Sequence, residues 1–321
     1  MAGRIFHRPL IEAVPDFRLA CMVGQADAAA TIDDPSIDLV VIATPNDTHA
    51  ELAERALLAG KHVVIDKPFV LGIEDGERLI EPAESEDRLL TIFHNRRWDG
   101  DYMTAADLLV SGRLGEVALF EAYWDRFRPV VPQGWREGAS PGAGTLWNLA
   151  PHLLDQLIML FGMPQSVQAD IACQRLGAAV DDYFALTFSY GRMRAVIGAS
   201  NLIAQPRARF AIHGMIGSYI KYGLDPQEER LAAGRSPLEP GFGSEPRERY
   251  GSLSEGEVSM PLATRDGCYL EFYRKVAEAI HDGAPPPVTP IEALDGIRLL
   301  LAAQSSADER REVTIDAAQP I

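Results

Sequence analysis

The sequence contains few cysteines and no apolar run long enough to cross a membrane. Three cysteines occur among 321 residues, at Cys21, Cys173 and Cys268, and their wide spacing fits neither a metal site nor a disulfide framework. We expect free thiols, no bound metal and a cytoplasmic location. An uninterrupted stretch of about 18 apolar residues, which a membrane-spanning helix needs, is missing. The first residues also lack the basic and apolar pattern of a targeting signal.

The sequence has fewer basic than acidic residues. The chain has 46 Asp and Glu against 30 Lys and Arg, a formal net charge of −16. Because an acidic surface repels nucleic acids and anionic membranes, we expect neither as a partner. Hydrophobic residues make up 47% of the chain and charged residues 24%, which is typical of a globular protein with room for two domains.

One stretch predicts a strand, a helix and a second strand in close succession. Apolar runs of strand length occupy residues 38–43 and 62–65. Between them, Thr48 and Glu51 have the spacing of a capping box at a helix start, and Gly60 is placed to end the helix in a left-handed conformation. Connections this short make a βαβ unit with two parallel, neighbouring strands.

Polar residues follow three predicted strands at their carboxyl ends. They are the segments 44–46 and 66–68 of the βαβ unit, and 94–98 after a further buried strand at 89–93. Ligands of parallel sheets bind beyond the carboxyl ends of the strands, so we expect these three segments at one site.

The front of this domain is abbreviated. We predict a helix over residues 1–17, a strand at 17–23 and a short helix at 26–32, which leaves little room for a complete crossover before the strand at 38. After the βαβ unit, a helix from about Gly72 is expected to be interrupted by Pro82.

The second part of the chain changes character after about Asp99. Strands that follow one another without helices predict an antiparallel or mixed sheet, and hence an α+β domain. We divide the chain into a Rossmann-like domain, 1–98, and a substrate and oligomerisation domain, 99–321. Its predicted strands are 117–126, 166–174, 182–189, 192–200 and 207–213, its predicted helices are 102–110, 145–161, 269–280 and 290–306, and 225–257 is a predicted surface excursion.

Lys67 and His152 are the first candidates for chemistry. A lysine at the carboxyl end of a parallel strand can donate to a substrate oxygen or assist proton transfer, although a solvent-exposed surface lysine is an equally simple interpretation. His152 shares a helix face with Asn148 and Asp155, which lie four residues before and three after it. A histidine can take the proton of an alcohol while a hydride leaves its carbon; a structural histidine is the alternative.

Other polar residues suit a nucleotide. His49 lies in the first turn of the predicted crossover helix, whose free N–H groups can accept phosphates, although helix capping alone also explains this segment. Asn95 and Arg96 follow a strand end, and an exposed loop is the alternative interpretation for them.

Taken together, these motifs resemble the Gfo/Idh/MocA family of nicotinamide-dependent oxidoreductases, named after glucose-fructose oxidoreductase, inositol dehydrogenase and a rhizopine catabolism protein. The matching stretches are AGRIFHRPLIEA, DLVVIATPNDTH, AGKHVVIDKP, FHNRRWDGD, GAGTLWNLAPHLLDQ and HGMIGSYIKYGLDPQE. The resemblance implies a Rossmann domain followed by an α/β domain with an open, mostly antiparallel sheet. It also implies oxidation of a sugar or polyol hydroxyl, or the reverse, with NAD or NADP, and a homodimer or homotetramer formed through the open sheet.

The resemblance assigns roles to individual residues. Lys67 matches the lysine of a Glu-Lys-Pro motif in which Asp66 replaces the glutamate, His152 matches a proton-transferring histidine, and Asp155 a substrate-binding acid. The expected catalytic residues are Lys67, His152 and Asn148. The expected cofactor-binding residues are Gly3, Thr44, Pro45, Asn46, His49, Asp66, Lys67, Asn95 and Arg96, and the expected substrate-binding residues are Asp155, Asn148 and Trp98.

This sequence departs from the family pattern in three places. Gly3 matches only the third glycine of a Gly-x-Gly-x-x-Gly turn, and the given sequence shows no match to the first strand or to the two earlier glycines. The region after Val23 lacks about a helix and a strand. Asn148 stands where the family has an aspartate, and an amide can orient His152 but cannot stabilise an imidazolium by charge. Two hypotheses therefore remain: an active oxidoreductase, or a non-catalytic relative that binds carbohydrate or serves in assembly.

Overall fold

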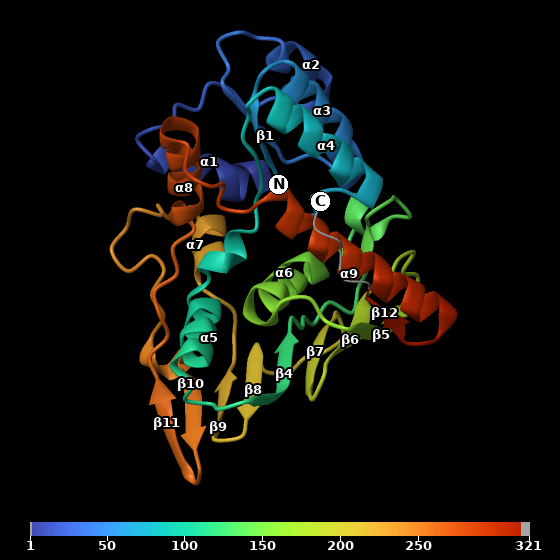
Figure 1. Cartoon of the computed structure of the whole chain (residues 1–321), viewed down its shortest axis with the longest axis vertical. Coiled ribbons are helices and arrows are strands. Elements are labelled where there is room, and N and C mark those ends of the chain that lie inside the picture. Colours follow the sequence, from blue (N-terminus) through green and yellow to red (C-terminus); the bar gives the residue numbers. More distant parts are fainter. Residues whose placement is uncertain (1, 316–321) are drawn as a thin grey trace. The chain divides into compact units, whose positions relative to one another are not determined.

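The computed structural model describes residues 2–315, and the chain divides into two compact units, each described here by itself (Figure 1). The first unit consists of Met1–Asp99, Pro226–Gly243 and Gly267–Ile297, and the second of Gly100–Asp225, Ser244–Asp266 and Arg298–Ile321. Each unit is therefore assembled from three separate segments of the chain, and the boundary between the last two segments falls inside one helix, α9 (Pro290–Glu309).

The first unit contains a parallel sheet of three strands in the order β1-β2-β3. These strands are β1 (Leu39–Ile42), β2 (His62–Ile65) and β3 (Leu90–Ile92). The apolar residues of β2 and β3 are buried, whereas in β1 only Ile42 is. The helix α3 (His49–Leu58) packs against β1, β2 and a second helix, α4 (Ile73–Ser85) (Figure 1). The predicted βαβ unit and its parallel pairing are confirmed.

The start of α3 differs from the prediction. The hydroxyl of Thr48 donates to the carbonyl oxygen of Pro45 at 2.8 Å and lies 2.6 Å from Thr44 Oγ1, and it caps no backbone N–H group. The predicted capping box of Thr48 and Glu51 is therefore wrong. Its physical cause is a 3₁₀ turn, η2 (Asn46–Thr48), which gives Thr48 a near-helical backbone instead of the extended one that a cap requires.

The end of α3 follows the prediction at Gly60. This glycine has a φ of +72°, in the left-handed region. Its N–H group donates to the carbonyl of Leu57 at 2.8 Å, and the N–H group of Lys61 donates to the carbonyl of Ala56 at 2.9 Å. This pair of bonds is the Schellman motif, which satisfies carbonyl groups left open at the helix end.

Two other predictions in the first unit are wrong. Residues 17–23 form no strand, because this mostly exposed segment pairs with no neighbouring strand. Pro82 does not interrupt its helix, since α4 continues to Ser85. The proline lies in the last turn, where the N–H of Glu86 still bonds to the carbonyl of Pro82 at 3.1 Å, so only the bond of its own missing N–H is lost.

The flanking helices of the first unit agree better with prediction. The opening helix consists of a π-helical turn, η1 (Gly3–His7), and α1 (Arg8–Ala13), and α2 (Gln25–Ile32) matches the predicted short helix. Later in the chain, α7 (Gln227–Ala232) and α8 (Leu270–Asp282) also belong to this unit.

The second unit is built on an open sheet of nine strands in the order β11-β10-β9-β8-β4-β7-β6-β5-β12. Every pair is antiparallel except β4 with β7, so the predicted mostly antiparallel sheet is confirmed. The strands are β4 (Val117–Tyr123), β5 (Ser166–Ala172), β6 (Tyr183–Tyr190), β7 (Met193–Ser200), β8 (Phe210–Gly214), β9 (Gly217–Lys221), β10 (Gly251–Glu255), β11 (Val258–Leu262) and β12 (Val313–Thr314).

One helix of this unit positions the candidate site. The helix α6 (Gly144–Phe161) packs against β6 and β7, and α5 (Gly100–Ser111) lies next to it (Figure 1). The segment 225–257, predicted as a surface excursion, contains α7 and β10, so that prediction is wrong in part. Its strand gains stability by pairing with β9 and β11, which local periodicity does not reveal.

Residues 2–315 include no helix with the length and apolar character needed to traverse a bilayer. The same part of the chain shows no cluster of three or more His, Cys, Asp or Glu side chains suited to a metal ion. The three cysteines are free, and Cys21 and Cys173 are exposed.

Candidate active site

In the first unit, His49 joins the carboxyl ends of two strands. Its Nδ1 atom lies 2.9 Å from the carbonyl oxygen of Pro68 and its Nε2 atom 3.2 Å from that of Thr44, and the side chain is fully buried. The segments 44–46 and 66–68 therefore lie side by side, as the parallel βαβ unit predicts. His49 acts here as a bridge between strand ends, and its predicted contact with a nucleotide stays a prediction.

The segment after β2 is held by backbone bonds. The N–H of Asp66 donates to the carbonyl of Ile42 at 2.8 Å, and the Asp66 carboxylate accepts the N–H of Lys67 at 2.9 Å. Lys67 is partly exposed at this strand end. Lys67 thus lies just beyond the carboxyl end of β2, the end at which ligands of parallel sheets bind.

A buried pair that the sequence analysis missed lies near Asp66. His7 Nδ1 is 2.6 Å from the hydroxyl of Tyr273, and the His7 ring packs 4.2 Å from the ring of Phe93. Burial lowers the pKa of His7, and Asp66 works in the opposite direction. Burial also raises the pKa of Tyr273, and Asp66 adds to that effect. The resemblance already covers His7 in its AGRIFHRPLIEA stretch, but Tyr273 belongs to a helix far along the chain.

The end of β3 presents two buried polar residues of different character. The guanidinium of Arg96 donates to Asp99 at 3.2 Å, to the Tyr269 hydroxyl at 3.1 Å and to Glu228. Burial alone would lower the pKa of Arg96, but Tyr269, Asp99 and Glu228 outweigh burial and raise it well above its usual value. Arg96 therefore has a structural role in this unit, and its predicted cofactor contact stays a prediction.

Asn95 is the second of these residues. Its side chain is 3% exposed, and its Nδ2 atom has no hydrogen-bond partner among the described residues. A buried amide N–H without an acceptor is costly, so this donor suits an acceptor on a bound ligand.

Two further predicted residues of the first unit have ordinary surroundings. A Cβ atom added at Gly3 would lie 3.5 Å from Met22 and 3.8 Å from Ala43, which is normal van der Waals contact, so packing alone does not demand glycine there. The ring of Trp98 packs edge-on against Phe272, with centroids 5.9 Å apart. The predicted ligand contacts of Gly3 and Trp98 stay predictions.

In the second unit, α6 carries the remaining predicted residues. Asn148, His152 and Asp155 lie on a continuous helix that runs through Pro151, so their spacing places them on one face. His152 is 7% and Asp155 5% exposed, while Asn148 is partly exposed. The helix thus brings an imidazole, a carboxylate and an amide together.

The sequence analysis missed the aromatic residue that contacts His152. Trp124, at the end of β4, stacks on the imidazole with ring centroids 5.7 Å apart and an interplanar angle of 27°. The guanidinium of Arg209 lies 5.7 Å from the same indole ring. An aromatic residue inside the predicted strand 117–126 was visible in the sequence, but its pairing with a helix residue depends on the fold.

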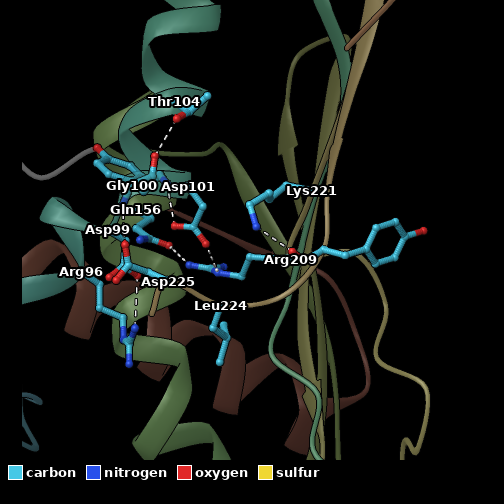
Figure 2. Close-up of polar contacts among 12 residues, drawn as sticks. Arg96, Asp99, Gly100, Asp101, Thr104, Gln156, Arg209, Lys221, Leu224 and Asp225 are labelled. Carbon is cyan, nitrogen blue, oxygen red and sulfur yellow. Dashed lines mark hydrogen bonds and ion pairs between the residues drawn. The ribbon is translucent and has the colours of Figure 1, made fainter. Parts of the chain in front are cut away.

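Arg209 is itself held by two side chains. Figure 2 shows its guanidinium between Asp101, at 3.5 Å, and the amide oxygen of Gln156, to which it donates a hydrogen bond. Both Arg209 and Asp101 are almost completely buried. The guanidinium of this ion pair also lies 4.2 Å from the ring of Phe210.

The start of α6 is fixed by Asp181. Its carboxylate accepts the N–H of Leu146 at 2.6 Å, and its carbonyl accepts the N–H of Thr145 at 2.9 Å. Burial raises the pKa of the Asp181 carboxyl from 3.8 to about 6, although the hydrogen bonds from Leu146 and Thr145 oppose this shift. Gly144, at a φ of +95°, leaves room for the carboxylate, since a Cβ there would lie 2.1 Å from it.

The fold and these residues define a class of two-unit α/β proteins. One unit has a parallel, Rossmann-type sheet with polar residues at its strand ends, and the other has an open sheet and a helix that carries a buried histidine. Two family models match the chain. One is described as the oxidoreductase family, NAD-binding Rossmann fold, over residues 8–94, and the other as the oxidoreductase family, C-terminal alpha/beta domain, over residues 106–315. The chain belongs to the Gfo/Idh/MocA oxidoreductase family.

Individual relatives agree with this assignment. The chain is 42% identical to the uncharacterised oxidoreductase YdgJ of Escherichia coli over 96% of its length and 94% of that protein. It is 35% identical to the scyllo-inositol 2-dehydrogenase (NADP(+)) IolW of Bacillus subtilis over 98% of its length and 94% of that protein. A solved structure of the oxidoreductase yvaA from Bacillus subtilis has a TM-score of 0.93 at 35% identity, covering 98% of this chain and 95% of that one.

Proposed function

We propose that this protein is an NAD- or NADP-dependent oxidoreductase that oxidises a CH–OH group of a sugar or polyol, or reduces the corresponding ketone. The observation that carries the proposal is the buried constellation on α6, where His152 and Asp155 share a face, in a chain whose other unit has a dinucleotide-type sheet. A buried histidine beside a carboxylate suits proton exchange with a substrate hydroxyl.

The residues at the strand ends fit a nicotinamide cofactor. Within residues 2–315 the buried Asn95 Nδ2 atom has no acceptor, and a carboxamide or ribose oxygen of the cofactor can supply one. Thr44, Pro45, Asn46 and His49 lie around the end of β1 and the start of α3, where a nucleotide binds in folds of this kind. When bound, the cofactor supplies or accepts the hydride.

The side chains of the protein then handle the proton and the substrate. An imidazole nitrogen of His152 takes the hydroxyl proton during oxidation and returns it during reduction. The Lys67 ammonium donates a hydrogen bond to the reacting oxygen, which favours negative charge there. Asp155 accepts hydrogen bonds from neighbouring substrate hydroxyls. Asn148 orients His152 or the substrate without adding charge.

The same proposal extends to cofactor, location and assembly. The name of the IolW relative specifies NADP(+), so both dinucleotides belong in any test of this chain. We also propose a cytoplasmic homodimer or homotetramer formed through the open sheet, which sedimentation of the purified protein would test. A monomer at all concentrations would contradict the assembly proposal.

A second candidate is a non-catalytic member of the family that binds carbohydrate or serves in assembly. It is favoured by Asn148, which cannot stabilise a protonated His152 by charge as a carboxylate would. This candidate predicts binding of a polyol without any change in the redox state of the cofactor.

One experiment separates the two candidates. Fluorescence titration with NADH and NADPH should show saturable binding. A turnover assay with NAD⁺ or NADP⁺ and a panel of polyols that includes scyllo-inositol should then show dinucleotide reduction. Lys67→Ala and His152→Ala should each lower kcat by about 10²- to 10⁴-fold, while Lys275→Ala, a change at a half-exposed lysine of α8, should not. Failure of both dinucleotides to bind would overturn the proposal, and binding without turnover would favour the second candidate.

A further inference from the structure

We infer that Trp124 and Arg209 are positioning residues that fix the orientation of the His152 imidazole, an inference that rests on the proposed role of His152 in proton transfer. Neither residue belongs to the predicted catalytic set, and both lie in the second unit with His152. The inference depends on successive contacts that join the Arg209 guanidinium, the Trp124 ring and the His152 ring of α6.

The first contact is the stacking of Trp124 on His152. The two ring centroids are 5.7 Å apart and the planes differ by 27°, which lies within the range of favourable offset stacking. Trp124 is 3% exposed and His152 7%. A large flat ring packed against one face of a buried imidazole opposes rotation of that imidazole about its side-chain torsions.

The second contact fixes the indole in turn. The guanidinium of Arg209 lies 5.7 Å from the Trp124 ring and 4.2 Å from the Phe210 ring, close enough for cation–π attraction at both. Trp124 therefore contacts both the imidazole and a buried cation. Because the guanidinium is planar, it can engage an aromatic face and two acceptors at once.

The third set of contacts anchors Arg209. Asp101 from α5 forms an ion pair with it at 3.5 Å, and Gln156 from α6 accepts a hydrogen bond from it (Figure 2). Gln156 lies four residues after His152, one turn along the same helix. The contacts thus form a closed circuit: from His152 to Trp124, to Arg209, to Gln156 and back along α6.

A buried ion pair is a poor device for stability alone. Desolvation of Arg209 and Asp101 offsets most of their attraction, and apolar side chains of similar volume would pack at little cost. What Arg209 does supply is direction, since it donates a hydrogen bond to the amide oxygen of Gln156. Through Trp124, these contacts act on the orientation of the His152 ring. A displacement of about 1 Å in a catalytic group costs on the order of 10²-fold in rate, so the contacts that set this ring matter for turnover.

The test uses three full-length variants: Trp124→Leu, Trp124→Phe and Arg209→Met. The control is Phe127→Leu, which removes an exposed aromatic ring three residues after Trp124. The first readout is the imidazole proton resonance of His152 in the free protein, identified by its loss in His152→Asn. We expect this resonance to move away from its ring-current-shifted position in Trp124→Leu, to keep a shift in Trp124→Phe, and to stay unchanged in Phe127→Leu. This readout needs neither cofactor nor turnover, so it tests the positioning even if the proposed reaction is wrong.

The second readout is kinetic. Trp124→Leu and Arg209→Met should lose about 10- to 100-fold in kcat with little change in KM, and Trp124→Phe should restore most of the loss because it keeps a flat ring. If Trp124→Leu does not fold, the comparison of Trp124→Phe with Arg209→Met carries the test. An unmoved His152 resonance in both Trp124→Leu and Arg209→Met, or a Phe variant as impaired as the Leu variant, would overturn the inference.

Discussion

The Nδ1 atom of His49 lies 2.9 Å from the carbonyl oxygen of Pro68, while the opposite nitrogen of the same ring lies 3.2 Å from the carbonyl oxygen of Thr44. One side chain in the first turn of α3 thus holds together the ends of β1 and β2. The strand ends that face a ligand in this fold are therefore held by a side chain rather than by backbone alone.

Replacing His49 should weaken this edge of the first unit. His49→Ala removes the contacts of the imidazole with the carbonyl groups of Pro68 and Thr44, and we expect the free energy of unfolding to fall by about 1 to 3 kcal/mol. The affinity for NADH or NADPH should fall as well, because segments 44–46 and 66–68 lose their connection. Denaturant titration and fluorescence binding measure the two effects. The matched control is His281→Ala, at an exposed histidine of the same unit; equal stability of the two variants would contradict the prediction.

Arg96 should be a strong determinant of stability in the first unit. Arg96→Met leaves the carboxylate of Asp99 buried without its cation, and removing one partner of a buried pair costs about 3 to 5 kcal/mol. The control is Arg55→Met, which breaks an exposed ion pair with Asp33 and should cost about 1 kcal/mol or less. Chemical denaturation followed by circular dichroism compares them. A loss in Arg96→Met no greater than that in Arg55→Met would show that the cluster is not stabilising.

Asp181 should make stability depend on pH in a defined direction. Its folded-state pKa is raised from 3.8 to about 6, so the folded protein binds this proton more tightly than the unfolded chain does. Its contribution to stability is therefore fully present below about pH 4 and is lost as the pH rises to about 6. A shift of about two pKa units corresponds to about 3 kcal/mol.

Asp181→Asn removes that titration but keeps an oxygen that can accept the N–H of Leu146. We expect the stability of the variant, relative to the natural protein, to increase between pH 4 and pH 7. Urea unfolding at a series of pH values measures this difference, and Asp170→Asn, at an exposed carboxylate, provides the control. A difference that stays constant across this range would refute the prediction.

Gly144 should tolerate no side chain. Its φ of +95° is strained for other residues, and a Cβ would lie 2.1 Å from an oxygen of Asp181. Gly144→Ala should destabilise the protein by at least about 1 kcal/mol, and because α6 begins at this residue and carries His152, kcat should fall too. Gly138→Ala is the control, since its nearest contact would be an ordinary 3.7 Å. Thermal unfolding with circular dichroism distinguishes the two, and an unchanged melting temperature in Gly144→Ala would contradict the prediction.

Local sequence pattern was sufficient to predict the helices and strands with strong hydrophobic periodicity. The strands β1 to β3, the glycine that ends α3, and α6 with its three polar residues all follow from spacing within short segments. The predicted strand at 17–23 failed because apolar residues form a strand only where a neighbour supplies hydrogen bonds. The strand β10 was missed for the converse reason, since its partners, rather than its own residues, make it a strand.

The sequence alone determined the family, the two-part architecture and a set of polar residues whose types suit hydride and proton transfer, because these depend on residue identity and local spacing. Only the tertiary structure decided which side chains hold those residues in place. Trp124 stacks on His152, Asp181 accepts an N–H group at the start of the helix that carries His152, and His49 bridges two strand ends. Such contacts join residues far apart along the chain, and they arise from the packing of whole elements, on which local pattern carries no information.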